Sequence, residues 1–296
     1  MIKINNITAG RFGNRILQYN SAYQLAKKLK TNMYCVEWEG NQFFDLPSHN
    51  EEPSSREEKL LTWRDCINPL WDDIKSMHEK FDLVIDDPAY LLHNTFFQLT
   101  HVDVREIFSI KKEFLPKLEA GTTNLGIHIR GGDTRGGDNN NCREIHTFEY
   151  YKNAIDEALK NSAIDNINIT SDDTDFDLFK KVLIYSDKVS GDAELIIGAA
   201  TFDSSMPHIY DFALLAECDY LIAGSSTYAV CAGIIGKNKK IIHSSEWIQK
   251  NIPGSTYVKW GNYTTDYPET YWRSWDNFWI KVNRGGNKFY SPWKIL

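Results

Sequence analysis

The stretch GIHIRGGDTRGGD, from Gly126 to Asp138, follows an apolar residue and holds a histidine, two arginines, two acids and five glycines within thirteen positions. The apolar run Leu125–Ile129 predicts a buried strand that ends where the glycines and charges begin. Ligands of α/β sheets bind at the carboxyl ends of the strands. We therefore expect this segment to grip an anion or to carry out chemistry.

Strand-like and helix-like segments alternate regularly from this run onward. The expected strands are Leu125–Ile129, Ile167–Thr170, Glu194–Ile197, Tyr220–Ala223 and Lys240–Ile242. The expected helices are Thr147–Lys160, Asp175–Ser186, Ile209–Glu217 and Tyr228–Ile235. This alternation predicts parallel βαβ units in a doubly wound sheet.

The N-terminal half begins with the same kind of unit. An extended apolar run from Ile2 to Ile7 is broken by TAGRFGN, and helical spacing of apolar residues follows from Ile16 to Leu29. Further strands are expected at Met33–Val36 and Asp82–Ile85. The pattern between Glu51 and Glu119 is less regular.

Length and charge limit the classes of function. A chain of 296 residues is large enough for two modest domains. Its 33 basic and 40 acidic residues give a net charge of −7 without a basic stripe, which argues against nucleic acid as a partner. The apolar stretches fall short of the roughly 20 residues that a membrane span needs.

The first residues and the cysteines indicate a protein of the cytosol. Met1 leads directly into an apolar strand without the basic and apolar regions of a secretory signal. Five scattered cysteines without a CxxC spacing fit reduced, buried thiols. We expect a soluble protein and leave its oligomeric state open.

Four loops at strand ends carry candidate binding groups. In GRFGN (Gly10–Asn14) backbone amides and a helix N-terminus can receive a phosphate, or the glycines only form a turn. Arg130 can grip phosphate oxygens in bidentate fashion, or form an ordinary salt bridge. SDD (Ser171–Asp173) ends another strand. The hydroxyls of Ser225–Thr227 can donate to a diphosphate or ribose, or merely cap the following helix.

These loops together resemble a known family. GRFGNRILQY (Gly10–Tyr19) resembles the GGxGNxxFQY opening of alpha-1,2-fucosyltransferases. HIRGGD (His128–Asp133) resembles the H-x-R-R-x-D motif that they share with alpha-1,6- and protein O-fucosyltransferases, and SDD resembles their second block. FALLAECDYLIAGSSTYAVCAG (Phe212–Gly233) resembles the third. Two positions depart from the motifs, Gly131 in place of the second arginine and Ala9 in place of a glycine.

The resemblance implies an α/β fold of the GT-B glycosyltransferase type, with two Rossmann-like domains facing across a cleft. Residues 1–120 would form the acceptor-side domain and residues 121–250 the domain that holds GDP-fucose. Residues 251–296, rich in tryptophan and tyrosine, would pack across the domains, with a sugar-stacking surface as the alternative. The implied activity is an inverting transfer of fucose to a glycan hydroxyl without a cofactor or a metal.

The resemblance also implies roles for single residues. Arg130 matches the arginine that contacts the donor diphosphate, and Asp211 falls where alpha-1,6 members place an acid on the guanine edge. Thr227 falls where they place a hydroxyl on the diphosphate. The nucleotide-sugar site is expected to comprise Gly10, Gly13, Asn14, His128, Arg130, Asp172, Asp211, Ser225, Ser226 and Thr227.

The catalytic acids and bases have rival assignments. Negative charge grows on the departing GDP, so Arg130 is the expected stabilising cation. Asp138 is the expected base for the acceptor hydroxyl, and Asp133 is its rival. His128 either holds the strand end or takes part in catalysis. The DxD at Asp173–Asp175 either binds a metal with the nucleotide or supplies helix N-caps.

Three rival functions remain from the sequence. The same scaffold can use UDP or another GDP-sugar as donor, because Gly131 removes a charge. A non-catalytic protein can bind glycans through the aromatic C-terminal segment. A Rossmann-type oxidoreductase is disfavoured because GxGxxG does not follow the first strand. The expected partners are a nucleotide sugar and a glycan acceptor, in the cytoplasm of a bacterial or viral source.

Overall fold

The structure, a computed structural model, describes most of the chain outside its C-terminal region. The described residues are 1–7, 11–47, 56–61, 71–85, 104, 106–131, 147–198, 206–224, 226–238, 240–243 and 256–257. Contacts divide the chain into two compact units that meet in sequence between Lys111 and Lys112. The division expected from the sequence lies after residue 120, and the roles expected for the two domains stay predictions. Of the aromatic segment 251–296, only Thr256–Tyr257 are described.

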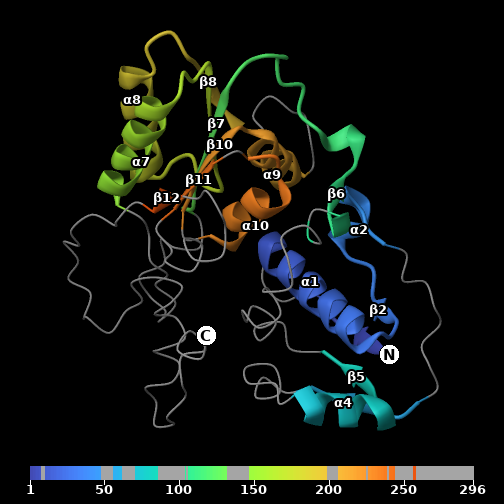
Figure 1. The fold of residues 1–296 in the computed structure, drawn as a ribbon. Helices are drawn as coiled ribbons and strands as arrows, with labels where there is room; N and C mark the ends of the chain where they lie inside the picture. The colour runs from blue at the N-terminus through green and yellow to red at the C-terminus, as the bar shows by residue number, and fades with distance from the viewer. Residues whose placement is uncertain are drawn as a thin grey trace, which may run out of the picture. The chain divides into compact units, whose positions relative to one another are not determined.

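The second unit is built on a parallel sheet in the strand order β12-β11-β10-β7-β8-β9 (Figure 1). The strands are β7 (Asn124–Ile129), β8 (Asn166–Ser171), β9 (Glu194–Ile197), β10 (Tyr220–Ala223), β11 (Lys240–His243) and β12 (Thr256–Tyr257). This order is that of the doubly wound Rossmann sheet. The predicted parallel βαβ units are therefore confirmed.

Helices cover both faces of this sheet. They are α7 (Phe148–Asn161), α8 (Asp177–Val189), α9 (Pro207–Glu217) and α10 (Thr227–Ile235), and a 3₁₀ turn η2 (Lys112–Phe114) precedes the sheet in the chain. Helices α7 and α8 pack together on one face, and α9 and α10 on the other (Figure 1). Right-handed crossovers between parallel strands produce this layering.

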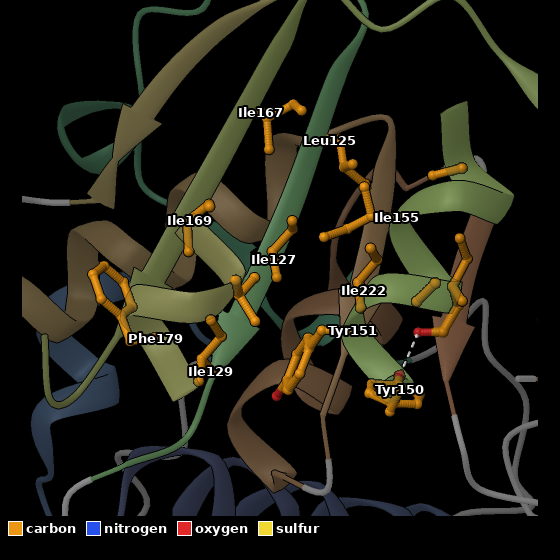
Figure 2. Close-up of a cluster of buried hydrophobic side chains, with 14 of the residues drawn as sticks. Leu125, Ile127, Ile129, Tyr150, Tyr151, Ile155, Ile167, Ile169, Phe179 and Ile222 are labelled. Carbon is orange, nitrogen blue, oxygen red and sulfur yellow. Dashed lines mark hydrogen bonds between the residues drawn. The ribbon is translucent and has the colours of Figure 1, made fainter. Parts of the chain in front are cut away.

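The core of the second unit lies between β7, β8 and α7. Alternate residues of the two strands, Leu125, Ile127 and Ile129 with Ile167 and Ile169, are fully buried. Helix α7 meets them with Tyr150, Tyr151, Ala154, Ile155 and Ala158, a set with helical spacing (Figure 2). The hydroxyl of Thr147 caps this helix by accepting from the Tyr150 amide at 3.3 Å.

The first unit contains a smaller parallel sheet in the order β2-β1-β5-β4. Its strands are β1 (Ile2–Ile4), β2 (Met33–Cys35), β4 (Glu58–Leu60) and β5 (Asp82–Val84), accompanied by α1 (Phe12–Leu29) and α4 (Trp71–Lys80). A short helix α2 (Glu39–Phe43) leads into β3 (Phe44–Asp45), which pairs in antiparallel fashion with β6 (Ser109–Ile110). Strand β1 ends at Ile4, earlier than the apolar run to Ile7 suggested.

Two further findings concern cysteines and membranes. Cys35, Cys218 and Cys231 are free thiols, and burial raises the pKa of Cys35 to about 12. Cys66 and Cys142 lie outside the described residues. Within the part of the chain that is described, none of the helices is long and apolar enough to cross a membrane.

A buried ion cluster ties the strands of the first unit together. Lys3 of β1 and Asp82 of β5 are nearly inaccessible, at 2% and 0% exposure, and their charged groups lie 3.2 Å apart. Lys3 also pairs with Glu58 of β4 at 3.0 Å, and the amino group of Met1 lies 2.8 Å from Asp82. Burial alone would lower the pKa of Lys3, but the hydrogen bonds and charges of Glu58 and Asp82 raise it overall.

We predict that Asp82→Asn destabilises the first unit by about 3 kcal/mol, because it leaves a buried ammonium beside a neutral amide. Glu58→Gln is the matched control, since Glu58 is half exposed and its loss costs about 1 kcal/mol or less. Urea unfolding at pH 7 measures both. Equal losses of unfolding free energy in the two variants would contradict this prediction.

The ion cluster also gives the stability of the first unit a pH dependence. Because the pKa of Lys3 is raised in the folded state, its contribution to stability is present at neutral pH and is lost as the pH rises above 10.5.

Candidate functional site

The candidate site of the second unit lies where β7 and β10 run side by side. The chain leaves β7 toward α7 on one face of the sheet, and it leaves β10 toward α10 on the other face. Adjacent parallel strands whose connections depart to opposite faces form a topological switch point, where doubly wound sheets bind ligands. Arg130 follows β7 directly, and Gly224 follows β10 directly.

Two neighbouring tyrosines of α7 hold the ends of these strands. The hydroxyl of Tyr150 donates to the carbonyl of Ala223 at 2.7 Å and lies 3.5 Å from that of Ile242. The hydroxyl of Tyr151 donates to the carbonyl of His128 at 3.1 Å. Figure 2 shows both side chains near the end of the core where β7 finishes. Burial raises the pKa of both tyrosines, so they remain protonated donors.

The segment around Arg130 is also fixed from β8. The backbone amide of Gly131 donates to a carboxylate oxygen of Asp172 at 2.6 Å. The charge of Asp172 adds to burial in raising the pKa of Tyr151, which places the carboxylate near the end of β7. Asp172 was predicted to bind the nucleotide sugar; in the structure its carboxylate holds the backbone next to Arg130. Its contact with a ligand stays a prediction.

The glycine at 131 has a steric cause. A Cβ at this position would lie 2.8 Å from the Cβ of Asp173 and 3.2 Å from the ring of Phe176. The loop between β8 and α8 therefore occupies the space that a side chain at 131 would need. An arginine at this position would clash with the loop as it is packed here.

The acids of the DxD sequence form a turn. The amide of Asp173 donates to the hydroxyl of Ser171 at 3.1 Å, and the amide of Asp175 donates to the carboxylate of Asp173 at 3.1 Å. The predicted N-cap role is wrong in detail, since Phe176 is the N-cap of α8 and makes no side-chain cap. Among the described residues, no group of three or more His, Cys, Asp or Glu side chains is arranged to hold a metal.

The turn after β10 brings two hydroxyl residues to the N-terminus of α10. Ser226 is the N-cap and Thr227 the first helical residue, and both are buried. The side chain of Ser226 makes no capping hydrogen bond, so the expectation that it caps the helix is not met. Ser225 lies outside the described residues. The N-terminal amides of a helix and its dipole favour an anion.

Asp211 lies on α9 against the end of β9. A Cβ added to Gly198 would meet a carboxylate oxygen of Asp211 at 2.8 Å, so the glycine allows this close approach. Gly198 also has a φ of +27°, outside the range that side chains prefer. The charges of Asp211 and Asp172, after burial, raise the pKa of Tyr228 in α10. Tyr228 therefore lies near both acids.

His128 is held within the strand end and is 6% exposed. The hydroxyl of Thr170 donates to the carbonyl of Ile127 at 3.5 Å, and its oxygen lies 3.1 Å from Nδ1 of His128. The contact between Thr170 and the imidazole therefore joins β8 to β7 at this strand end. The ring of Tyr228 packs against that of His128 with centroids 5.0 Å apart. These contacts fit a side chain that supports the strand end, one of the two roles expected for it.

The remaining predicted residues fall in two groups. Gly13 and Asn14 belong to the first turn of α1 in the first unit, which begins at Phe12, so the predicted loop is already helical there. Gly10 and the rival bases Asp133 and Asp138 lie outside the described residues.

The aromatic residues that support the site were not predicted from the sequence. They are three tyrosines of helices, Tyr150, Tyr151 and Tyr228. At such positions the sequence pattern indicates only that a tyrosine belongs to the apolar face of the helix. Buried phenols usually find hydrogen-bond partners, which is the signal that could have marked them. Their partners are backbone carbonyls distant in sequence.

Comparisons with known proteins identify the fold. No family model and no curated protein matches the sequence. A solved structure of FUT1 from Arabidopsis thaliana, a point mutant in complex with GDP, matches with a TM-score of 0.52 and 11% sequence identity. The match covers 82% of this chain and 70% of that chain. At this identity the likeness is one of fold, and it confirms the predicted α/β fold class of GT-B glycosyltransferases.

We predict that Tyr150→Phe lowers the unfolding free energy of the second unit by about 1–2 kcal/mol, because it removes the donor to the buried Ala223 carbonyl. Tyr185→Phe is the matched control, since its hydroxyl bonds to Asp156 at an exposed position and its loss costs about 0.5 kcal/mol or less. Denaturant unfolding followed by tyrosine and tryptophan fluorescence measures both. If both variants lose the same small amount of unfolding free energy, Tyr150 does not hold the end of β10.

Proposed function

We propose that the protein is an inverting glycosyltransferase that transfers fucose from GDP-fucose to a hydroxyl of a glycan, without a metal. One observation carries the proposal: Arg130, the N-terminus of α10 and Asp211 belong to the carboxyl-end side of one sheet with the Rossmann strand order. The likeness in fold to a fucosyltransferase solved with GDP supports it. The alpha-1,2 linkage rests on the sequence resemblance alone.

The donor would bind with its diphosphate between β7 and β10. Arg130 would neutralise the charge that grows on GDP as the glycosidic bond breaks, and the amides at Ser226 and Thr227 would add donors. Asp211 would accept hydrogen bonds from the guanine edge. The base that takes the proton from the acceptor hydroxyl would be Asp138 or its rival Asp133.

Gly131 is the observation that favours a different donor. The motif of the fucosyltransferases has a second arginine at this position, and its absence removes one charge from the donor site. A UDP-sugar or another GDP-sugar would use the same strand edge. The non-catalytic alternative, a glycan-binding protein, predicts carbohydrate binding that does not depend on a nucleotide.

We predict that GDP raises the melting temperature of the protein and that UDP at the same concentration does so less. A ligand that binds only the folded state at 100 times its Kd stabilises it by about 2.7 kcal/mol. Thermal-shift measurements over a concentration series of each nucleotide test this. A larger shift with UDP than with GDP would show that the donor is a UDP-sugar. If neither nucleotide shifted the melting temperature, the glycan-binding alternative would be favoured.

We predict that Arg130→Ala weakens GDP binding by about 10- to 100-fold, the effect of losing a charge-assisted hydrogen bond. Lys160→Ala is the control, because it removes an exposed cation from the last turn of α7. Isothermal titration with GDP measures affinity, and release of GDP from GDP-fucose measures turnover. If Arg130→Ala left both the affinity for GDP and the turnover unchanged, the assignment of the diphosphate site to the end of β7 would be wrong.

A further inference from the structure

Tyr228 connects the end of β7 to α9. It lies in the first turn of α10 and is half-buried. One face of its environment is the imidazole of His128, with ring centroids 5.0 Å apart. Another is the ring of Phe212, met edge-on with centroids 5.3 Å apart. Its hydroxyl donates to the carbonyl of His208.

The two α9 contacts enclose Asp211. His208 and Phe212 are one helical turn apart, so Tyr228 holds that turn at both of its ends. Asp211 belongs to the same turn, and Gly198 limits its carboxylate from the side of β9. Lateral movement of this turn would change where the carboxylate lies relative to the strand ends.

The β7 side of the connection is rigid. His128 is buried, is hydrogen-bonded to Thr170 on the neighbouring strand, and has its carbonyl bound by Tyr151. A ring packed on this imidazole is therefore fixed relative to the sheet. The phenol of Tyr228 also stays protonated, since burial and the charges of Asp211 and Asp172 raise its pKa well above the ordinary value. The hydroxyl therefore keeps the proton that it donates to the α9 carbonyl.

We propose that Tyr228 is a positioning residue for base selectivity: it holds Asp211 at the place where its carboxylate distinguishes guanine from other bases. This inference rests on the proposed function. A carboxylate can accept from both N1–H and the 2-amino group of guanine, and hypoxanthine offers only N1–H. Selectivity of this kind depends on the position of the carboxylate, which Tyr228 sets through His208 and Phe212.

The experiment compares the Kd values for GDP and IDP by isothermal titration of the full chain. The unmodified protein is expected to bind GDP about tenfold or more tightly than IDP, because IDP lacks one donor to a charged acceptor. Tyr228→Phe keeps the ring and removes only the hydrogen bond to His208, and it is expected to reduce this ratio about threefold or more. Tyr228→Leu also removes the ring contacts, and a larger reduction is expected. Tyr185→Phe, the matched control on α8, leaves the ratio unchanged.

A second background separates positioning from general destabilisation. If Tyr228 acts through Asp211, then Tyr228→Phe has no further effect on the ratio in a protein that already carries Asp211→Asn. If Tyr228 has a purely structural role, Tyr228→Phe weakens the binding of GDP and of IDP in the same proportion, so the ratio of their Kd values stays the same while the melting temperature falls. An unchanged ratio in folded Tyr228→Phe, or an equal reduction in the Asp211→Asn background, overturns the inference. If the unmodified protein binds GDP and IDP equally well, Asp211 does not recognise the 2-amino group and the inference fails while the proposed donor stands; if it binds neither, the proposed donor is wrong.

Discussion

The carbonyl groups at the ends of β7 and β10 are the constraint on which the second unit depends. At this switch point the registered pairing of β7 with β10 ends at Ile127 and Ile222, and His128 and Ala223 are the next residues of the two strands. Buried carbonyls of this kind must be satisfied by other donors. Tyr150 and Tyr151 provide these donors from α7, at Ala223 and His128. One turn of one helix thereby binds both of the strands that flank the candidate site.

The predicted ligand-binding groups are attached to this fixed frame at short range. Arg130 lies two residues beyond the carbonyl that Tyr151 holds, and the next amide is bound by Asp172. The hydroxyls of α10 begin three residues beyond Ala223. Groups that must meet a diphosphate in one geometry gain from such support, because less conformational entropy is lost on binding.

The strands of the second unit could be predicted well from the sequence, whereas the side-chain contacts that hold the candidate site could not. Strands at Glu194–Ile197 and Tyr220–Ala223 have the predicted bounds, because short apolar runs between helical patterns are typical of buried parallel strands. Strand β4 was not predicted, since all three of its residues are exposed and its links to the sheet, the backbone pairing with β5 and the ion pair of Glu58 with Lys3, join positions far apart in the chain. The bond from Asp172 to the Gly131 amide joins positions far apart in the chain, so no local pattern reveals it.

Gly131 links the departure from the motif to the geometry of the strand end. Only a residue without a Cβ lets Asp173 approach this closely, and that approach belongs to the same loop that brings Asp172 to the amide of Gly131. A second guanidinium at this position and this packed loop exclude one another. Under the proposed function, charge on the leaving diphosphate would therefore fall more heavily on Arg130 and on the amides of α10 than in a site with two arginines. The glycine then allows the loop to pack against the strand end at the expense of one cation.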